Sequence, residues 1–342
     1  MLSSISSSES QARHGVPGDG QQHTAPPVDD GSGSTGNRLN APSGRWIFAA
    51  LAGIATVLVG MEAATRLEFD KISKLQSRMH AERAKVTSQL TKPSSQTTVL
   101  MVGNSLLLEG VDFDEFRNAL SVRVQAYRYI VTQTAYWDWF YGLRRLFSEG
   151  VRPTYLLLGM SPSQLARDST RGDYSAFYLF DLRGVIDYSR QQHLDFTTAS
   201  SLVFAHSSQF YAARSEIRAT LIERFFPSYF EALHLVTTAT APEDNGRLQS
   251  IVAERLVALD ELCRANGVKL LFVVPPTDEE SEPPAVAAGR EAGVPVLLPV
   301  RRQTLTTSQF ADGFHLNAAG RKIFTRALID TMETILPKGK EL

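Results

Sequence analysis

Residues 97–112, TTVLMVGNSLLLEGVD, limit the possible fold more than any other stretch of the chain. A short apolar run at 99–102 stops at Gly103 and Asn104, and a leucine-rich segment follows from Ser105. Such a run, followed by helix-forming residues, is typical of a strand, a tight turn and a helix start. This prediction places Ser105 at the carboxyl end of a strand, the edge at which open α/β sheets bind their ligands.

Four more apolar runs extend the pattern and predict the rest of a sheet. One of them, PTYLLLG at 153–159, is almost continuously apolar, as expected for a strand buried in a parallel sheet. Strands that alternate with helices predict an α/β fold, a three-layer α/β/α sandwich with a mostly parallel five-stranded sheet. The expected strands are 99–102, 122–127, 153–159, 268–274 and 294–300, and the expected helices are 112–120, 135–147, 242–265, 285–292 and 318–335.

Residues 165–235 carry no strong strand signal and predict a helical insertion in this domain. Insertions of this kind often form a lid or a binding wall over a site. His193, His206 and His234 lie in or beside it, and none is spaced from another His, Cys or acid as metal ligands are. We therefore expect no metal and no cofactor.

The chain ends and the overall composition restrict the possible partners. Residues 1–45 are rich in Ser, Gly, Pro, Gln and Asn, and such a segment cannot bury enough surface to offset its ordering entropy, so we predict disorder. Residues 338–342 form a short tail. The formal net charge is −1, which gives no reason to expect nucleic acid. The single cysteine, Cys263, excludes an internal disulfide.

Residues 46–61 are sixteen residues without a charge. With the four that follow, they reach the ~20 residues that a bilayer-spanning helix needs. Arg45 and Arg66 flank the run, and Trp46 suits a membrane interface. We interpret 46–65 as an uncleaved, single-pass transmembrane helix. The alternatives are a buried core helix, which the polar flanks disfavour, and a cleaved signal peptide, whose charged leading region would be too long.

Residues 66–95 connect this helix to the α/β domain, which we place at 96–337. Leu75, Met79, Val86 and Leu90 recur at roughly helical spacing among many polar residues. The pattern predicts a polar stalk helix. The proline and serines near its end predict a break before the domain.

Three residues that are far apart in sequence suggest nucleophilic catalysis. A serine nucleophile needs a base that takes its proton and a group that orients the base. Ser105 could be the nucleophile, His315 the base, and Asp312 the group that fixes the tautomer of His315. The alternative for the second pair is structural, because Asp312 or Asn317 could equally cap the last helix.

Two blocks of the sequence resemble the SGNH/GDSL hydrolases. GNSLLLEG, from Gly103 to Gly110, is similar to their first block, G-D-S-x-x-x-x-G, and DGFHLNAAG, from Asp312 to Gly320, is similar to their last block, D-x-x-H-x-x-x-x-G. The resemblance covers residues 96–337. It implies a flavodoxin-like three-layer sandwich, ester hydrolysis or acyl transfer through an acyl-serine, and no metal.

The middle blocks of that family, which supply a glycine amide and an asparagine side chain to the oxyanion hole, are altered here. Asn104 replaces the usual aspartate of the first block. The loop VTQT at 131–134 stands where the glycine block belongs, and Ser161 stands where the asparagine belongs. The expected oxyanion donors are therefore the Ser105 amide, Ser161 and Gln133, and loss of one such donor costs about 10²–10³ in rate.

From these residues we predict a membrane-anchored SGNH-type serine esterase, deacetylase-like, with the catalytic residues Ser105, Asp312 and His315. An O-acyltransferase for an exported polysaccharide would use the same residues, and a catalytically inactive binding or scaffold module would keep the same fold. The resemblance implies an acylated cell-envelope carbohydrate as substrate, polysaccharide-biosynthesis proteins as partners and a domain on the non-cytoplasmic (periplasmic) side. Membrane lipid is the expected partner of the N-terminal helix. The greater number of Lys and Arg residues after that helix opposes this orientation, although long domains translocate regardless of charge.

Overall fold

The computed structural model describes residues 44–225, 244–277 and 282–337. The chain divides into two units, Met1–Ala52 and Gly53–Leu342, and the folded domain lies in the second. The predictions for the tails, for His234 and for the end of the insertion lie outside the described residues.

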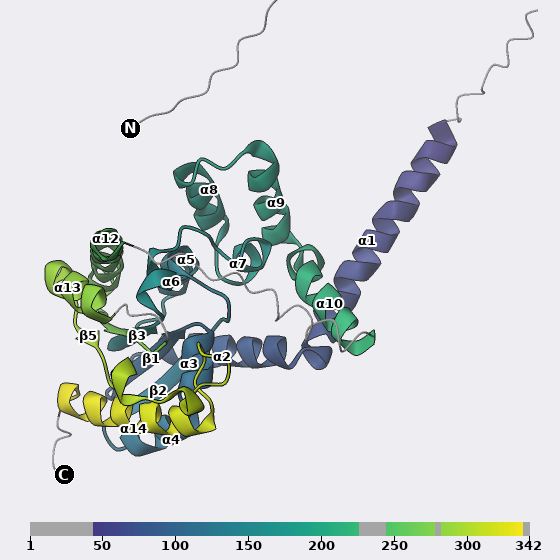
Figure 1. The fold of residues 1–342 in the computed structure, drawn as a ribbon. Coiled ribbons are helices and arrows are strands. Elements are labelled where there is room, and N and C mark those ends of the chain that lie inside the picture. The colour runs from purple at the N-terminus through teal and green to yellow at the C-terminus, as the bar shows by residue number, and fades with distance from the viewer. Residues whose placement is uncertain (1–43, 226–243, 278–281, 338–342) are drawn as a thin grey trace, which may run out of the picture. The chain divides into compact units, whose positions relative to one another are not determined.

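A five-stranded sheet with every neighbouring pair parallel forms the centre of the domain (Figure 1). Its strand order, β2-β1-β3-β4-β5, is the flavodoxin-like, doubly wound order. Gly103 pairs with Ile130 on one side and with Gly159 on the other, so three strands end together at one edge. The predicted α/β fold class is confirmed. The strands are β1 (Thr97–Gly103), β2 (Val124–Ile130), β3 (Tyr155–Gly159), β4 (Lys269–Val273) and β5 (Val296–Leu297).

The two faces of the sheet carry separate apolar cores, which makes the fold three-layered. Along β1, Leu100 and Val102 belong to one core and Val99 and Met101 to the other, as expected for side chains that alternate across a buried strand. The first core includes residues of α2 (Lys74–Leu90), α5 (Tyr136–Ser148), α12 (Asn245–Arg264) and α13 (Glu282–Ala292). The second includes residues of α3 (Ser105–Gly110), α4 (Phe113–Leu120) and α14 (Ala318–Ile335).

β5 is shorter than the seven residues predicted for it. Pro295 and Pro299 flank its two residues, and a proline has no N–H group to donate to a neighbouring strand. The strand still pairs with β4, because the carbonyls of Pro295 and Leu297 accept hydrogen bonds from Phe272 and Val274.

The segment predicted as a polar stalk, residues 66–95, is not a free linker in the structure. Helix α1 (Gly44–Ile72) continues beyond the predicted span, and Ser73 caps the start of α2 by accepting a hydrogen bond from the Gln76 amide. Met79 and Val86 of α2 are buried in the first core. Their spacing places them on one apolar stripe of the helix, and that stripe packs on the sheet instead of facing solvent. Helix α2 is therefore part of the domain.

α2 also covers the edge of the sheet. Glu82 accepts a hydrogen bond from the Ile130 amide at 3.0 Å and from Arg128 Nε at 2.6 Å, both on the edge strand β2. Arg78 of α2 pairs with the same carboxylate. An exposed edge strand is a template for unwanted pairing, and this cover removes it.

Among the described residues, one helix, Arg45–Ile72, is long and apolar enough to cross a membrane. Its most apolar stretch has a mean hydropathy of 2.0, and none of that stretch is buried.

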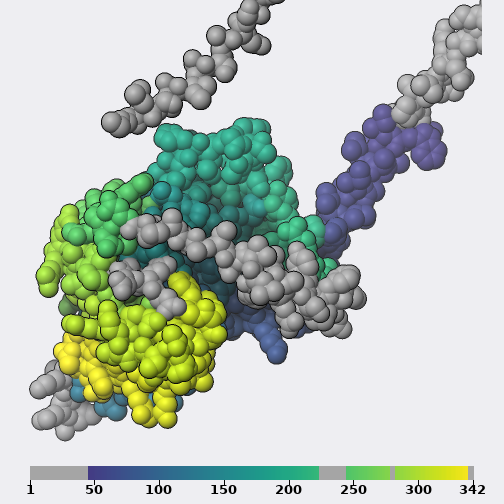
Figure 2. Space-filling view, viewed as in Figure 1, coloured from purple at the N-terminus to yellow at the C-terminus, as the bar shows by residue number. Residues whose placement is uncertain are grey.

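The described part of the insertion is helical, as predicted. Figure 2 shows it in teal as a lobe beside the green and yellow C-terminal elements. Its helices are α6 (Pro162–Ala166), α7 (Asp173–Tyr178), α8 (Leu182–Gln191), α9 (Phe196–Ser207) and α10 (Gln209–Phe225).

Candidate active site

The turn after β1 places Ser105 as the first residue of α3. Asn104, fully buried, is the N-cap of this helix, and its side-chain oxygen accepts a hydrogen bond from the Leu106 amide at 3.1 Å. Its Nδ2 donates to the Thr134 carbonyl at 3.0 Å and to Gln164 Oε1 at 2.8 Å. One amide thus joins the turns after β1, β2 and β3. An aspartate could not make the last two bonds, because a carboxylate only accepts.

Glycine is required where β1 and β3 end. A Cβ on Gly103 would lie 2.1 Å from the Gly159 carbonyl oxygen, and a Cβ on Gly159 would lie 2.5 Å from the Leu107 side chain. The missing side chains let the first turn of α3 settle over the end of β3. Gly110, the last glycine of the same block, has no such restriction, because a Cβ there would make ordinary contact with Phe324 at 3.6 Å.

The structure brings the three predicted residues together. Ser105 Oγ lies 2.9 Å from His315 Nε2, and His315 Nδ1 lies 2.8 Å from Asp312 Oδ2. If Nδ1 donates to the carboxylate, Nε2 is left as the acceptor of the serine proton. The order hydroxyl, imidazole, carboxylate is that of a serine-hydrolase triad.

The loop that carries His315 is held largely by its own residues. The Ala311 amide donates to the His315 carbonyl at 2.8 Å, and Asn317 caps α14 by accepting from the Ala319 and Gly320 amides. The capping role that sequence left open between Asn317 and Asp312 thus belongs to Asn317. Gly320 lets the loop approach the helix, because a Cβ there would lie 2.4 Å from the Gln309 carbonyl oxygen.

The charge on Asp312 is stabilised locally. Its burial would raise the pKa of the carboxyl, but hydrogen bonds from the His315 amide and ring and from the Phe314 amide lower that pKa below its ordinary value. Asp312 is therefore ionised at neutral pH. Its side chain is 56% exposed, whereas the His315 side chain is 27% exposed. The orienting aspartate of a serine-protease triad is buried, so this site is more open on its acidic side.

The three oxyanion candidates lie at the same edge of the sheet but differ in availability. The Ser105 amide is at the first position of α3, where helix amides have no intrahelical partner. The hydroxyl of Ser161, which is fully buried, accepts from the Gln164 amide at 3.2 Å and lies 2.8 Å from Ser163 Oγ. The Ser161 amide donates to Gln164 Oε1 at 3.0 Å. Both polar groups of Ser161 therefore serve the capping of α6.

Gln133, in the loop where a glycine was expected, adopts a left-handed backbone conformation. Its φ is +59°, in the left-handed region that glycine enters freely and other residues enter at a cost of about 1–2 kcal/mol. The residue is exposed, between the buried Val131 and Thr134. Thr134 fixes the turn, donating to the Val131 carbonyl at 2.6 Å and accepting from Trp139 Nε1 at 2.9 Å.

A buried polar group that the sequence interpretation missed supports the same loop. Asp138, at the start of α5, accepts hydrogen bonds from the Ala135 amide at 2.7 Å and the Arg171 amide at 3.0 Å. Arg171 in turn donates to the Thr132 carbonyl at 3.1 Å and pairs with Glu216 of α10. Burial raises the pKa of Asp138 to about 6, although the hydrogen bonds from these amides act to lower it. The only sequence signal was a lone acid in an aromatic helix.

The two described histidines of the insertion, His193 and His206, make their hydrogen bonds within the insertion. His206 Nδ1 lies 2.8 Å from the Ala176 carbonyl oxygen, and His193, two residues after the end of α8, has a left-handed φ of +49°. Across residues 44–225, 244–277 and 282–337, no group of three or more His, Cys, Asp or Glu side chains is arranged to hold a metal ion.

No protein-family model matches this chain, and no curated protein matches it. Among solved structures, a crystal structure of TesA is similar, with a TM-score of 0.37 and 13% sequence identity over 70% of this chain and 100% of that chain. A likeness of that size establishes neither family nor activity.

Proposed function

We propose that this protein is a membrane-anchored serine esterase of the SGNH type, which removes ester-linked acyl groups through an acyl-Ser105. The observation that carries the proposal is the chain of contacts from Ser105 Oγ to His315 at 2.9 Å and from His315 to Asp312 at 2.8 Å.

The chemistry follows from the geometry of these three residues. His315 Nε2 takes the proton of Ser105 Oγ as the oxygen attacks the ester carbonyl carbon. The same proton then passes to the leaving alcohol, and the acyl group stays on Ser105. Water attacks the acyl-serine with His315 again as base, His315 returns the proton to Ser105 Oγ, and the carboxylic acid leaves. Asp312 accepts the Nδ1–H bond throughout and stabilises the imidazolium.

The oxyanion of each tetrahedral intermediate needs donors that are already in place. We assign the Ser105 amide and the loop that contains Gln133 to this role. The Ser161 hydroxyl is fully buried and lies 2.8 Å from Ser163 Oγ, so it can serve as the second donor only if its proton is not given to Ser163.

The proposed location and substrate rest on the sequence. The apolar α1 anchors the chain in a membrane, with the domain on the non-cytoplasmic side. The proposed substrate is an acylated cell-envelope carbohydrate, a class that the motif resemblance implies. Proteins of polysaccharide biosynthesis are the proposed partners.

The first test compares hydrolysis of p-nitrophenyl acetate by the full chain in detergent with that of Ser105→Ala. We expect the variant to fall to the buffer rate while it keeps the wild-type circular dichroism spectrum. Equal rates for the two proteins would contradict an acyl-serine route.

The engaged Ser161 favours a second candidate, a non-catalytic module on the same fold. A fluorophosphonate probe separates the two, because it labels an activated serine and leaves an inert one unmodified. Labelling of the wild type at Ser105 that His315→Ala abolishes supports the esterase. Absence of labelling on folded protein supports the module. If labelling occurs, an added oligosaccharide acceptor and mass spectrometry distinguish hydrolysis from acyl transfer, since both share the acyl-serine.

A further inference from the structure

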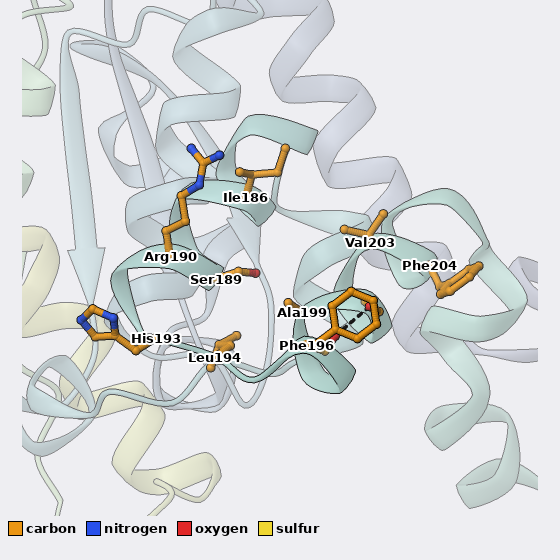
Figure 3. A pocket seen from close by; sticks show the side chains of 10 residues that line it. Ile186, Ser189, Arg190, His193, Leu194, Phe196, Ala199, Val203 and Phe204 are labelled. Atoms are coloured by element: carbon orange, nitrogen blue, oxygen red, sulfur yellow. Dashed lines mark hydrogen bonds between the residues drawn. The ribbon is translucent and has the colours of Figure 1, made fainter.

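An apolar groove lies between α8 and α9, in the helical insertion. Its volume is ≈ 870 Å³, and most of its lining is apolar (Figure 3). Figure 3 shows Ile186 contributed by α8, and Val203 and Phe204 contributed by α9. The groove, hereafter the α8–α9 groove, is lined on its apolar side by Ile186, Leu194, Phe196, Ala199, Val203 and Phe204.

The large side chains of the groove are exposed to an extent that a water-facing surface does not explain. Phe196 is 87% exposed and Phe204 is 66% exposed. Clustered exposed apolar residues with a polar rim mark sites that contact a protein, a ligand or a membrane.

The groove is joined to the apolar helix α1 by a set of hydrogen bonds. Glu62 of α1 accepts from Ser208 Oγ at 2.7 Å and from the amides of Gln209 and Phe210 at 3.0 Å each. Ser208 lies between α9 and α10, and Gln209 and Phe210 begin α10, so the carboxylate of α1 caps α10. Figure 1 shows α9 leading into α10 at this point.

This connection places the C-terminal end of α9, and Phe204 near it, close to the point where α1 would leave a membrane. Glu62 is the first charged residue after the uncharged run 46–61, so it marks the point at which α1 would leave the hydrocarbon. Phe204 precedes Ser208 by four residues, about 6 Å along a helix. The headgroup layer is about 5–8 Å thick on each side of the bilayer. Phe204 therefore lies within about 6 Å of this boundary along α9, in the headgroup layer or in the adjoining hydrocarbon.

The charges at the rim suit a phosphate headgroup. Arg190 lines the groove and is exposed, and within the described residues no carboxylate pairs with it. The nearby acids are engaged, since Asp187 pairs with Arg144 and Asp195 caps α9 through the amides of Thr197 and Thr198.

We propose that the α8–α9 groove binds a phospholipid of the bilayer, with an alkyl chain between the two helices and the phosphate beside Arg190. The inference rests on the proposed membrane insertion of α1. It gives the domain a second contact with the membrane, which restricts its rotation about the anchor helix.

The depth of single spin labels tests the proposal in the full chain, reconstituted into bilayers of phosphatidylcholine and phosphatidylglycerol. Native Cys263 stays unlabelled, because it is fully buried and burial raises the pKa of its thiol to about 12. Labels are placed at Phe196→Cys and Phe204→Cys. Val122→Cys is the matched control, because Val122 is 90% exposed on the turn before β2. Ile54→Cys reports the insertion of α1 separately.

We expect labels at 54, 196 and 204 to collide several-fold more with dissolved oxygen than with a water-soluble nickel complex, and the label at 122 to show the reverse. Arg190→Glu should shift the label at 204 towards water, whereas Lys322→Glu should not. Labels at 196 and 204 in water with 54 in lipid would overturn the groove proposal and leave the anchor intact. Labels at 196 and 204 that are shielded from both reagents would also overturn it, in favour of a protein occupant. A label at 54 in water would overturn both.

Discussion

The two ends of the candidate triad are built differently. Ser105 follows a buried strand. The residue before it, Asn104, donates from Nδ2 to Thr134 after β2 and to Gln164 after β3. His315 and Asp312 lie on a loop whose hydrogen bonds are mostly between near neighbours, and Asp312 is more than half exposed. The nucleophile therefore depends on the whole sheet edge, and the base depends on one loop.

This contrast teaches where a substitution should act. A change at the base end should reduce catalysis and leave the free energy of unfolding nearly intact, because exposed and local contacts contribute little to it. A change at the nucleophile end should first destabilise the fold, because it leaves buried polar groups unpaired or forces a clash.

The largest effect is expected for Asp312→Asn at the base end. The amide can no longer hold His315 in the tautomer that accepts the serine proton, so kcat/KM for p-nitrophenyl acetate should fall by about 10²–10⁴. Thermal unfolding should change little. Asp330→Asn, an exposed acid on α14, is the control and should keep full activity. A large fall in the unfolding temperature of Asp312→Asn would show that the loop is a structural element instead.

Asn104→Asp should have the next largest effect, on stability. The new carboxylate would face two acceptors, the Thr134 carbonyl and Gln164 Oε1, inside the protein. A buried charge without a partner costs about 3–5 kcal/mol in the free energy of unfolding. Chemical denaturation measures it, with Asn118→Asp on the exposed face of α4 as the matched control. Equal stability would mean that Gln164 turns its amide to donate, which would sacrifice its bond from the Ser161 amide.

Gly103→Ala tests the steric restriction at the same end. Its Cβ would lie 2.1 Å from a backbone carbonyl oxygen, so strands must separate, and overpacking of this kind costs up to about 3 kcal/mol. Gly110→Ala belongs to the same motif but would make only ordinary contact, so we expect it to be neutral. If both variants lose the same stability, close packing at the strand ends does not explain the first glycine.

The sequence was sufficient for the sheet and for much of the triad geometry, for a physical reason. Buried parallel strands are continuous apolar runs, and the helix predicted at 318–335 has those bounds in the structure because Asn317 caps it. The two motif blocks identified Ser105, Asp312 and His315, and their contacts fit the motif. Their catalytic role stays a prediction.

What the sequence did not disclose is non-local. The bond from Asn104 to Gln164 spans sixty residues, and no local pattern predicts it. The apolar stripe that contains Met79 and Val86 can be recognised in the sequence. The sequence does not show which surface this stripe packs against. The left-handed φ of Gln133 was hidden because the loop is held by a non-local contact, the hydrogen bond from Asn104 Nδ2 to the Thr134 carbonyl.

The smallest effect concerns pH and a second carboxyl at the buried end. The pKa of Asp138 rises from 3.8 to about 6 on folding, so between these values the folded state holds a proton that the unfolded state has lost. The free energy of unfolding should therefore fall as pH rises from 4 to 6, by on the order of 2 kcal/mol from this group. Denaturation at several pH values should show that slope, and Asp138→Asn should remove it even if the variant is less stable throughout. Asp312 has the opposite sign, since its pKa is lowered, and any stability it adds is lost only as pH falls below the ordinary range of an aspartate. A slope that survives Asp138→Asn unchanged would show that another buried group titrates, and that the loop of Gln133 is not held by an acid poised near neutrality.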